Sequence, residues 1–194
     1  MDALQIIQSE HRSLNAVLHC LDSVVAEARE TSAAPDFMLL DAIVDYIDRF
    51  PDQVHHPKED GYLFPAIERR RPALRPVLDA LRAEHGRCAA LTAELRAALD
   101  FYRRAPEQGL TVFAAAVRGY VDFQRAHLQR EEREVIPIAR QVLAPDERAA
   151  LDRAFAKNVD PLFGCKPEAE FEALFTRIVN LAPPPLGLGL GKPI

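Results

Sequence analysis

The sequence predicts an all-α protein whose main part is a four-helix bundle, followed by a short helical extension. Apolar side chains recur every three or four residues through most of the chain, which is the spacing of one face of a helix. Alternating runs of β-branched residues, which would predict strands, do not occur, and the prolines and glycines fall mainly between the apolar stripes. A repeated pattern of histidines and glutamates divides these helices into two similar hairpins.

The first predicted helix covers residues 3–29, and one polar side chain, that of His11, interrupts its apolar stripe. The second covers residues 36–70 and contains Pro51 and Pro57. A proline inside a helix removes a backbone donor, and its ring meets the carbonyl group of the preceding turn. We therefore expect the second helix to be kinked or split into two segments near these prolines.

The third predicted helix covers residues 72–103 and begins with a proline, which the first turn of a helix accepts. His85 interrupts its apolar stripe as His11 does in the first helix. The fourth covers residues 111–143, and three consecutive positions of its stripe are polar. Pro137 is expected to kink the second half of this helix.

We expect two parts along the chain, a bundle domain at residues 1–144 and an extension at residues 145–194. The extension should contain one short helix from about Asp146 and another over about 168–180, followed by a Pro- and Gly-rich tail without regular structure. Its apolar residues exceed what the bundle needs, so they either pack back on the bundle or form a homodimer contact. Nothing in the extension indicates a site.

Composition excludes several classes of function. The formal charge of −5 offers no basic surface for nucleic acid, and no apolar run approaches the roughly 20 residues that span a bilayer. The N-terminal residues lack the features of a signal peptide. Three cysteines, Cys20, Cys88 and Cys165, follow no metal-binding or disulfide spacing, so we expect free thiols. These features predict a cytoplasmic protein that binds neither nucleic acid nor membrane.

Four pairs of residues recur at an almost constant interval, which is 72 residues for three pairs and 74 for one. The pairs are His55 with His127, Glu59 with Glu131, Pro65 with Pro137 and, at the longer interval, His11 with His85. Each half of the bundle is therefore a helical hairpin with one histidine on its first helix and an HxxxE motif on its second.

Residues four apart lie on one face of a helix, so the two ends of each HxxxE reach the same place from adjacent turns. Two hairpins packed about a pseudo-two-fold axis would bring six side chains into one core layer. Imidazole and carboxylate without thiolate suit iron or manganese, with zinc as a further option, and paired carboxylates in a helix bundle are typical of di-iron centres. Burying these groups without a metal would be costly. The predicted ligands are His11, His55, Glu59, His85, His127 and Glu131.

Several neighbouring side chains compete for a role. His56 lies three residues before Glu59 and could replace His55 as a ligand, but the 72-residue interval favours His55 and leaves His56 beside the ligands. His19 lies away from the apolar stripe and is interpreted as a surface histidine. Four more side chains lie near the predicted ligands, with ordinary packing as the simpler interpretation and an orienting or hydrogen-bonding role as the other: Cys88, Gln124, Tyr62 and Tyr120.

Four segments contain the predicted ligands: EHRSLNAVL from Glu10, HHPKEDGYLFPAI from His55, EHGRCAAL from Glu84 and HLQREEREVIPIA from His127. Together they resemble the hemerythrin-like HHE cation-binding family, specifically its bacterial branch, over about residues 3–143. The resemblance implies an up-down-up-down bundle with a non-haem di-iron centre. In such a centre the four histidines would be terminal ligands, the two glutamates would bridge the irons, and an oxo or hydroxo group would complete the bridge.

Two departures from the oxygen-carrying members of that family affect the expected function. Those members have a further histidine four residues after the ligand of the third helix, where this chain has Ala89. They also have a longer spacing to an aspartate in the fourth helix, where this chain has HxxxE. Fewer protein ligands leave positions for water, oxygen, nitric oxide or peroxide. The chain is then similar to the bacterial proteins linked to nitric oxide and oxidative stress.

The expected cofactor is a pair of non-haem iron ions, which we favour over zinc or manganese, and the expected partner is a small gaseous or peroxide ligand. The favoured function is to bind or sense oxygen, nitric oxide or a related small molecule in a stress response. One alternative is a di-iron enzyme that reduces nitric oxide or decomposes peroxide. Another is an iron donor or storage protein for iron–sulfur repair.

Overall fold

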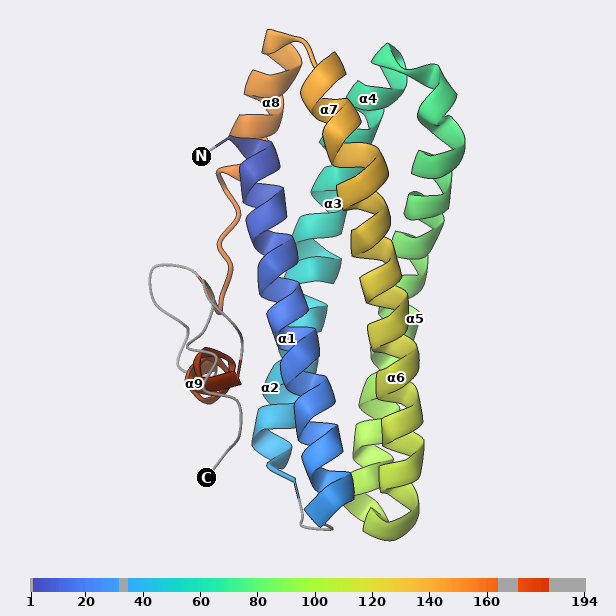
Figure 1. The fold of residues 1–194 in the computed structure, drawn as a ribbon, viewed down its shortest axis with the longest axis vertical. Helices are drawn as coiled ribbons and strands as arrows, with labels where there is room; N and C mark the ends of the chain where they lie inside the picture. Colours follow the sequence, from blue (N-terminus) through green and yellow to red (C-terminus); the bar gives the residue numbers. More distant parts are fainter. Residues whose placement is uncertain (1, 32–34, 164–170, 182–194) are drawn as a thin grey trace.

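The computed structural model describes residues 2–31, 35–163 and 171–181. The helices join into four long segments at residues 3–31, 37–70, 72–104 and 106–142. In Figure 1 these segments lie side by side, and successive ones run in opposite directions. The described part of the chain consists of helices and their connections and contains no strand. The predicted all-α fold class is therefore confirmed.

The first segment is α1, Ala3–Thr31, which ends two residues beyond the predicted end. Its apolar stripe is buried, and so is His11, which is 3% exposed. The second segment begins with α2, Phe37–Ile47. The carboxylate of Asp36 accepts hydrogen bonds from two backbone N–H groups of the first turn of α2, which would otherwise lack partners.

The second segment stays helical past its prolines. After α2 come a π-helical stretch at Asp48–His55, then α3 at His56–Lys58, a second π-helical stretch at Glu59–Leu63, and α4 at Phe64–Arg70. Pro57 and Pro65 lie in the first turns of α3 and α4. The wider π turn before each proline accommodates the missing donor and the proline ring. The kink or split expected in this helix therefore takes the form of a change of helix type.

The fourth segment repeats the plan of the second, whereas the third is one long α-helix after a short turn. The third consists of a 3-10 turn at Pro72–Leu74 and α5 at Arg75–Arg104. The fourth consists of α6 at Pro106–Arg130, a π-helical stretch at Glu131–Val135, and α7 at Ile136–Val142. Pro137 lies in the first turn of α7 as Pro65 does in α4. The 72-residue repeat thus includes the π turns as well as the prolines.

The fourth segment starts five residues earlier than predicted, since α6 begins at Pro106 and includes Gly109. A Cβ atom at Gly109 would lie 2.3 Å from the Cα atom of Tyr102 in α5. The glycine allows the two helices to approach closely beside their connection. In the sequence, Pro106 and Gly109 together look like a loop, whereas in the structure one starts the helix and the other permits a contact.

The buried polar residues lie in a layer between two apolar clusters. One cluster is formed mainly by the second half of α1, α2, the second half of α5 and the first half of α6, and includes Leu18, Ile43, Leu99 and Phe113. The other is formed by the beginnings of α1 and α5 with α4, α7 and α8, and includes Ile7, Leu63, Leu81 and Val135. The layer between them is therefore shielded from water along the bundle axis.

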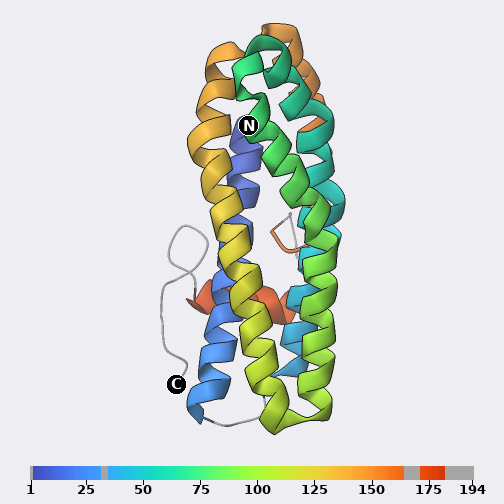
Figure 2. The same cartoon turned by 90° about the vertical axis from the view of Figure 1, so that its right-hand side faces the viewer.

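The extension packs back on the bundle. α8, Pro145–Phe155, contacts α1, and the backbone N–H of Ala3 donates a 2.7 Å hydrogen bond to the carboxylate of Asp152. α9, Glu172–Leu181, contacts α1 and α2 and runs across them (Figure 1, Figure 2). The apolar residues of this region that join the first cluster are Leu162, Phe171, Leu174 and Ile178.

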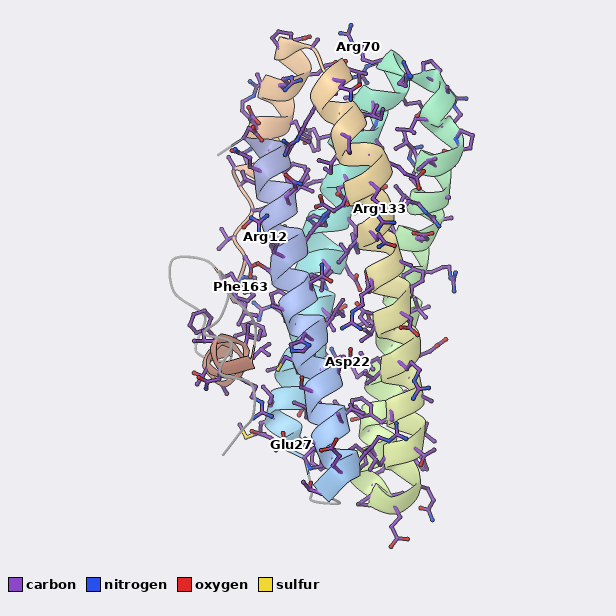
Figure 3. All side chains as sticks on the ribbon, viewed as in Figure 1. Arg12, Asp22, Glu27, Arg70, Arg133 and Phe163 are labelled. Atoms are coloured by element: carbon purple, nitrogen blue, oxygen red, sulfur yellow. The ribbon has the colours of Figure 1, made fainter. Side chains whose placement is uncertain are left out.

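Charged side chains such as Arg12 and Arg133 lie on the outside of the bundle (Figure 3). Among the described helices, none has the length and apolarity needed to cross a membrane. Cys20 and Cys88 are buried free thiols, as expected. The predictions for Cys165 and for the tail after residue 182 fall outside the described residues. The division into two domains and the homodimer contact stay predictions.

Candidate metal centre

The structure brings all six predicted ligands into one layer, where they form two overlapping clusters. The first cluster contains His11, His55, Glu59 and Glu131, and the second contains Glu59, His85, His127 and Glu131. Within each cluster, one possible ligand atom per residue lies within 4.8 Å of each of the others. Both glutamates belong to both clusters. The arrangement therefore provides two adjacent candidate metal positions that share two carboxylates.

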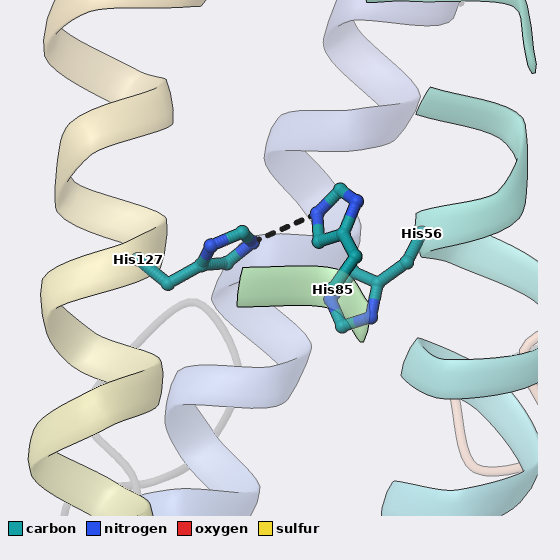
Figure 4. A group of neighbouring side chains, drawn as sticks. All are labelled: His56, His85 and His127. Carbon is teal, nitrogen blue, oxygen red and sulfur yellow. Dashed lines mark hydrogen bonds between the residues drawn. The ribbon is translucent and has the colours of Figure 1, made fainter. Parts of the chain in front are cut away.

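The two histidines of each cluster face each other through the same ring atom. The Nε2 atoms of His11 and His55 are 3.2 Å apart, and those of His85 and His127 are 3.1 Å apart (Figure 4). The carboxylate oxygens lie close by. His11 Nε2 is 3.3 Å from an oxygen of Glu131, and the other distances from Nε2 atoms to the two glutamates run from 3.4 to 3.8 Å.

The other ring nitrogen of each histidine, Nδ1, contacts a different carboxylate. The four pairs are His11 with Glu132 at 2.8 Å, His55 with Glu10 at 2.7 Å, His85 with Asp60 at 3.0 Å and His127 with Glu84 at 2.8 Å. An ionised carboxylate only accepts hydrogen bonds, so each Nδ1 donates. In the neutral imidazole the Nε2 atom then carries a lone pair. The four rings are oriented as metal-binding histidines are in other proteins, with the coordinating nitrogen pointing inward.

These hydrogen bonds leave pairs of Nε2 lone pairs facing each other, which is repulsive unless a cation lies between them. Glu59 is fully buried and Glu131 is 1% exposed, yet none of their four carboxylate oxygens has a hydrogen-bond partner among the described residues. Buried charged groups without partners are costly. Metal ions held by both glutamates and the four Nε2 atoms would remove both problems, so the residues present fit a metal pair.

In the metal-free protein, protons bound to His11 and His85 supply positive charge to the two clusters. Burial by itself would lower the pKa of His11, but its contacts with Glu131, Glu132 and Glu59 raise that pKa well above the ordinary value. Burial opposes the charge on His85 as well, and Asp60 with the shared glutamates raises its pKa to about 10. Conversely, the surrounding histidines overcome the effect of burial and hold the pKa of Glu131 well below its usual range. Each cluster thus attracts positive charge.

Four carboxylates hold the Nδ1 atoms, and none of them was predicted from the sequence. They are Glu10, Asp60, Glu84 and Glu132, and each is the immediate neighbour of a predicted ligand. They follow the same repeat, because Glu10 and Glu84 are 74 residues apart and Asp60 and Glu132 are 72 apart. Their spacing in the repeat was the signal in the sequence that could have identified these four carboxylates. The charged run from Arg130 to Glu134, Glu131 excepted, is interpreted from sequence as a solvated helix face. For Glu132 that interpretation is wrong, because its carboxylate is turned inward to His11.

The model of the hemerythrin HHE cation-binding domain matches residues 2–139, well over half of the chain. The chain belongs to the hemerythrin HHE cation-binding domain family. Membership and the two clusters together show that it is a helical protein that binds metal cations.

Relatives of this HHE protein include Rv1995 of Mycobacterium tuberculosis strain H37Rv and Mb2018 of Mycobacterium bovis, both described as uncharacterized proteins. Each is 25% identical over 155 residues, which is 80% of this chain and 58% of the relative. The chain therefore spans less than two thirds of the length of these relatives. No solved structure matches the chain.

The HHE domain has different surroundings on its two sides. Beside the first cluster, the side-chain amide of Asn158 donates a 2.7 Å hydrogen bond to Glu10, and the ring of Phe155 lies edge-on to His55 with the centroids 6.3 Å apart. Beside the second cluster, the guanidinium of Arg130 bonds to Glu84. The extension therefore reaches the first cluster, although its sequence indicates no site.

His56 is buried next to the second cluster but belongs to neither group of four. Its ring stacks on that of His85 with the centroids 4.3 Å apart and the planes 16° apart (Figure 4). Burial and the neighbouring histidines hold its pKa well below the ordinary value, so the ring is neutral. His55 lies in the first cluster. The two adjacent histidines are thus both in the layer, on different sides of it.

The remaining candidates have clearer positions. Gln124 donates to the hydroxyl of Tyr120 at 2.9 Å and contacts the sulfur of Cys88 at 3.7 Å, so these three side chains form a buried polar group below the layer of ligands. Burial raises the pKa of the Cys88 thiol to about 12. Tyr62 is 50% exposed and His19 is also exposed. None of these side chains is part of the two clusters.

Proposed function

We propose that this protein is a non-haem di-iron protein that binds or senses oxygen, nitric oxide or a related small molecule in a stress response. One observation carries the proposal. Two clusters of two histidines each share Glu59 and Glu131, and the four oxygens of these glutamates have no hydrogen-bond partner among the described residues. Paired carboxylates between imidazoles inside a helix bundle are the usual arrangement of di-iron proteins.

The donor set supports iron. Each cluster offers two imidazoles and two carboxylates and contains no thiolate, a mixture that suits iron and, to a lesser degree, manganese or zinc. The glutamates would supply the negative charge that two divalent or trivalent ions need. The four Nδ1 contacts would hold the imidazoles in a fixed direction, so little reorganisation would accompany metal binding.

The number of ligands supports a small-molecule function. Four protein residues surround each position, fewer than the six donors that iron commonly takes, so exogenous ligands have positions to fill. A bound iron pair would supply open coordination and one-electron redox change. The chain itself supplies a dry surrounding, because apolar clusters lie on both sides of the layer and the ligands are buried.

The experiment is to measure metal content and the optical spectrum of freshly purified protein before and after dithionite, and then after nitric oxide. We expect about two irons per chain, charge-transfer bands that bleach on reduction, and a change of spectrum on adding the gas. Glu131→Gln is the variant that should lose these bands, and Glu134→Gln, an exposed glutamate of the same turn, is its control. A colourless protein that holds zinc and responds to neither reagent would overturn the proposal.

A further inference from the structure

His56 is a buried side chain whose polarity the six predicted ligands do not explain. It is 3% exposed, and neither of its ring nitrogens has a hydrogen-bond partner among the described residues. A buried imidazole without partners costs free energy, and a leucine of similar size would not. The corresponding position of the other half, 72 residues later, is Leu128, which is also buried. The chain therefore places a histidine on one side of the layer and an apolar residue on the other.

The position of His56 is suited to the second metal position. One nitrogen each of His56, His85 and His127 lie within 4.8 Å of one another (Figure 4). The ring of His56 is 5.4 Å from that of His127 and nearly perpendicular to it, at 80°. Three imidazoles thus lie together, and two of them, those of His85 and His127, also form a group with the shared glutamates. Among the described residues, the group on the first side contains two imidazoles, those of His11 and His55.

A carboxylate also lies near the Nδ1 atom of His56, as one does for each of the four predicted histidine ligands. His56 Nδ1 is 3.5 Å from Asp52 Oδ1, and this oxygen likewise lacks a hydrogen-bond partner among the described residues. The other oxygen of Asp52 accepts a 3.0 Å hydrogen bond from the hydroxyl of Thr92, which holds the carboxylate in place. A small movement would give His56 the same Nδ1 contact that the four ligand histidines have, with Nε2 left free.

We propose that His56 is a fifth histidine ligand and that its Nε2 atom binds the metal ion of the second cluster. This inference rests on the proposed metal pair. The second ion then has three imidazoles and the first has two, so the ions are inequivalent.

Metal binding at His56 requires a small movement of its ring. Two imidazoles that bind one ion each have the ion in their ring plane, so they cannot stay stacked in parallel as His56 and His85 are. The ring of His56 therefore has to tilt out of this stack. His56 follows directly after the π-helical stretch Asp48–His55, whose hydrogen bonding differs from that of an α-helix at this point.

The test compares wild type with His56→Leu, which copies Leu128 of the other half, and with His19→Leu as an exposed-histidine control. Each protein is loaded with cobalt(II), and the number of ions, their affinities and the visible absorption are measured. We expect His56→Leu to weaken one of the two ions by roughly tenfold or more and to change the absorption that reports coordination number. In His56→Gly, added imidazole should restore the wild-type absorption. His19→Leu should match wild type.

The outcomes separate the two proposals. If wild type binds two ions and His56→Leu binds two with the same affinities and absorption, His56 is not a ligand and the metal pair stands. If His56→Leu changes as expected but imidazole does not restore the absorption of His56→Gly, the change is structural and the ligand role falls. If wild type does not bind two ions, the metal pair itself is wrong, and the role of His56 falls with it.

Discussion

The two halves of the bundle present the same ligands to the metal layer but hold them differently. In the first half, Glu10 bonds to His55 with one oxygen and to the neutral amide of Asn158 with the other. In the second half, Glu84 bonds to His127 and to the charged guanidinium of Arg130. A cation bonded to a carboxylate weakens that carboxylate as a hydrogen-bond acceptor for other groups, and a neutral amide weakens it less. Glu10 is therefore the stronger acceptor for the Nδ1 proton of its histidine, and at a bound metal His55 would be the better donor of the two.

This difference shows that a repeat can build a symmetric ligand layer while the residues around it make the two sides unequal. The interval of 72 to 74 residues reproduces the ligands, the π turns and the four carboxylates. It does not reproduce His56, whose place in the other half is taken by Leu128, and Asn158 and Phe155 lie outside the repeat. These three side chains are where the two metal positions diverge.

The largest effect should come from replacing a residue that belongs to both ligand clusters. Glu131→Gln removes a charge that belongs to both clusters, so we expect the protein to lose both ions and the stability they add. At a free metal concentration one hundred times the dissociation constant, binding stabilises a fold by about 2.7 kcal/mol. The check is metal content after desalting, with thermal unfolding in the presence and absence of metal. Retention of two ions would show that the carboxylate does not bridge them.

Removing a single histidine should cost the protein one ion rather than two, whichever half it comes from. His55→Ala and His127→Ala each take a ligand from one cluster only, so each variant should keep about one ion. Metal analysis beside wild type gives the count. If either variant lost both ions, the two positions would fill only together, and the two sides could not be treated separately.

The metal-free protein should be less stable at alkaline pH. His85 has an ordinary pKa of 6.5 that folding raises to about 10, and the pKa of His11 is raised in the same direction. A raised pKa means that the folded state binds the proton more tightly, so this stabilisation is full below pH 6.5 and is lost as pH rises toward 10. Urea unfolding of the metal-free protein at pH 6 and pH 9.5 would measure it. Equal stability at both values would contradict the assignment of these protons.

Metal binding has to displace the same protons. Because a coordinating histidine must be neutral, affinity should rise with pH over the range in which His11 and His85 are still protonated. The expected result is release of about one proton per ion, since each cluster holds one such histidine. Calorimetric titration in buffers of different ionisation enthalpy counts the protons. Release from one side only would show that the two halves differ already without metal.

The smallest effects should come from the carboxylates and their partners. Glu10→Gln and Glu84→Gln keep the size of the side chain but remove its charge, and each should weaken one ion by about 10- to 100-fold. Asn158→Ala acts through Glu10 and should do less. Dissociation constants measured with a competing chelator would rank the three variants. A loss in Asn158→Ala as large as that in Glu10→Gln would mean that Asn158 positions the carboxylate rather than merely contacting it.

The fold class and the six residues of the layer could be predicted because both depend on spacing along the chain. Helical periodicity identified four long helices, and the constant interval singled out histidines and glutamates that any one motif would have left ambiguous. The structure brings all six together, and their role as ligands stays a prediction. Glu10 and Glu132 were missed because a charged residue beside a buried one usually faces solvent, and only the packing of a neighbouring helix turns it inward.

Other features depend on tertiary contacts that spacing does not encode. The amide of Asn158 meets Glu10 across 148 positions of the chain, and no pattern in the sequence links them. The early start of α6 depends on how closely Gly109 approaches Tyr102. The prolines predicted a disturbed helix, but whether a helix breaks or widens is decided by the neighbours that keep its far end in place.

The two matching π turns have a consequence for how this gene can change. In each, a backbone N–H bonds five residues back, from Phe64 to Glu59 and from Ile136 to Glu131, so each turn is an α-helix with one residue inserted. Deleting an exposed residue there, such as Arg133, would remove the extra residue and leave the helix on either side of the turn in α-helical register. The apolar face of α7 would still point to its core. In these two turns a one-codon deletion should therefore disturb the following helix less than a deletion within α5 or α6, where the loss of one residue rotates all that follows by about 100°.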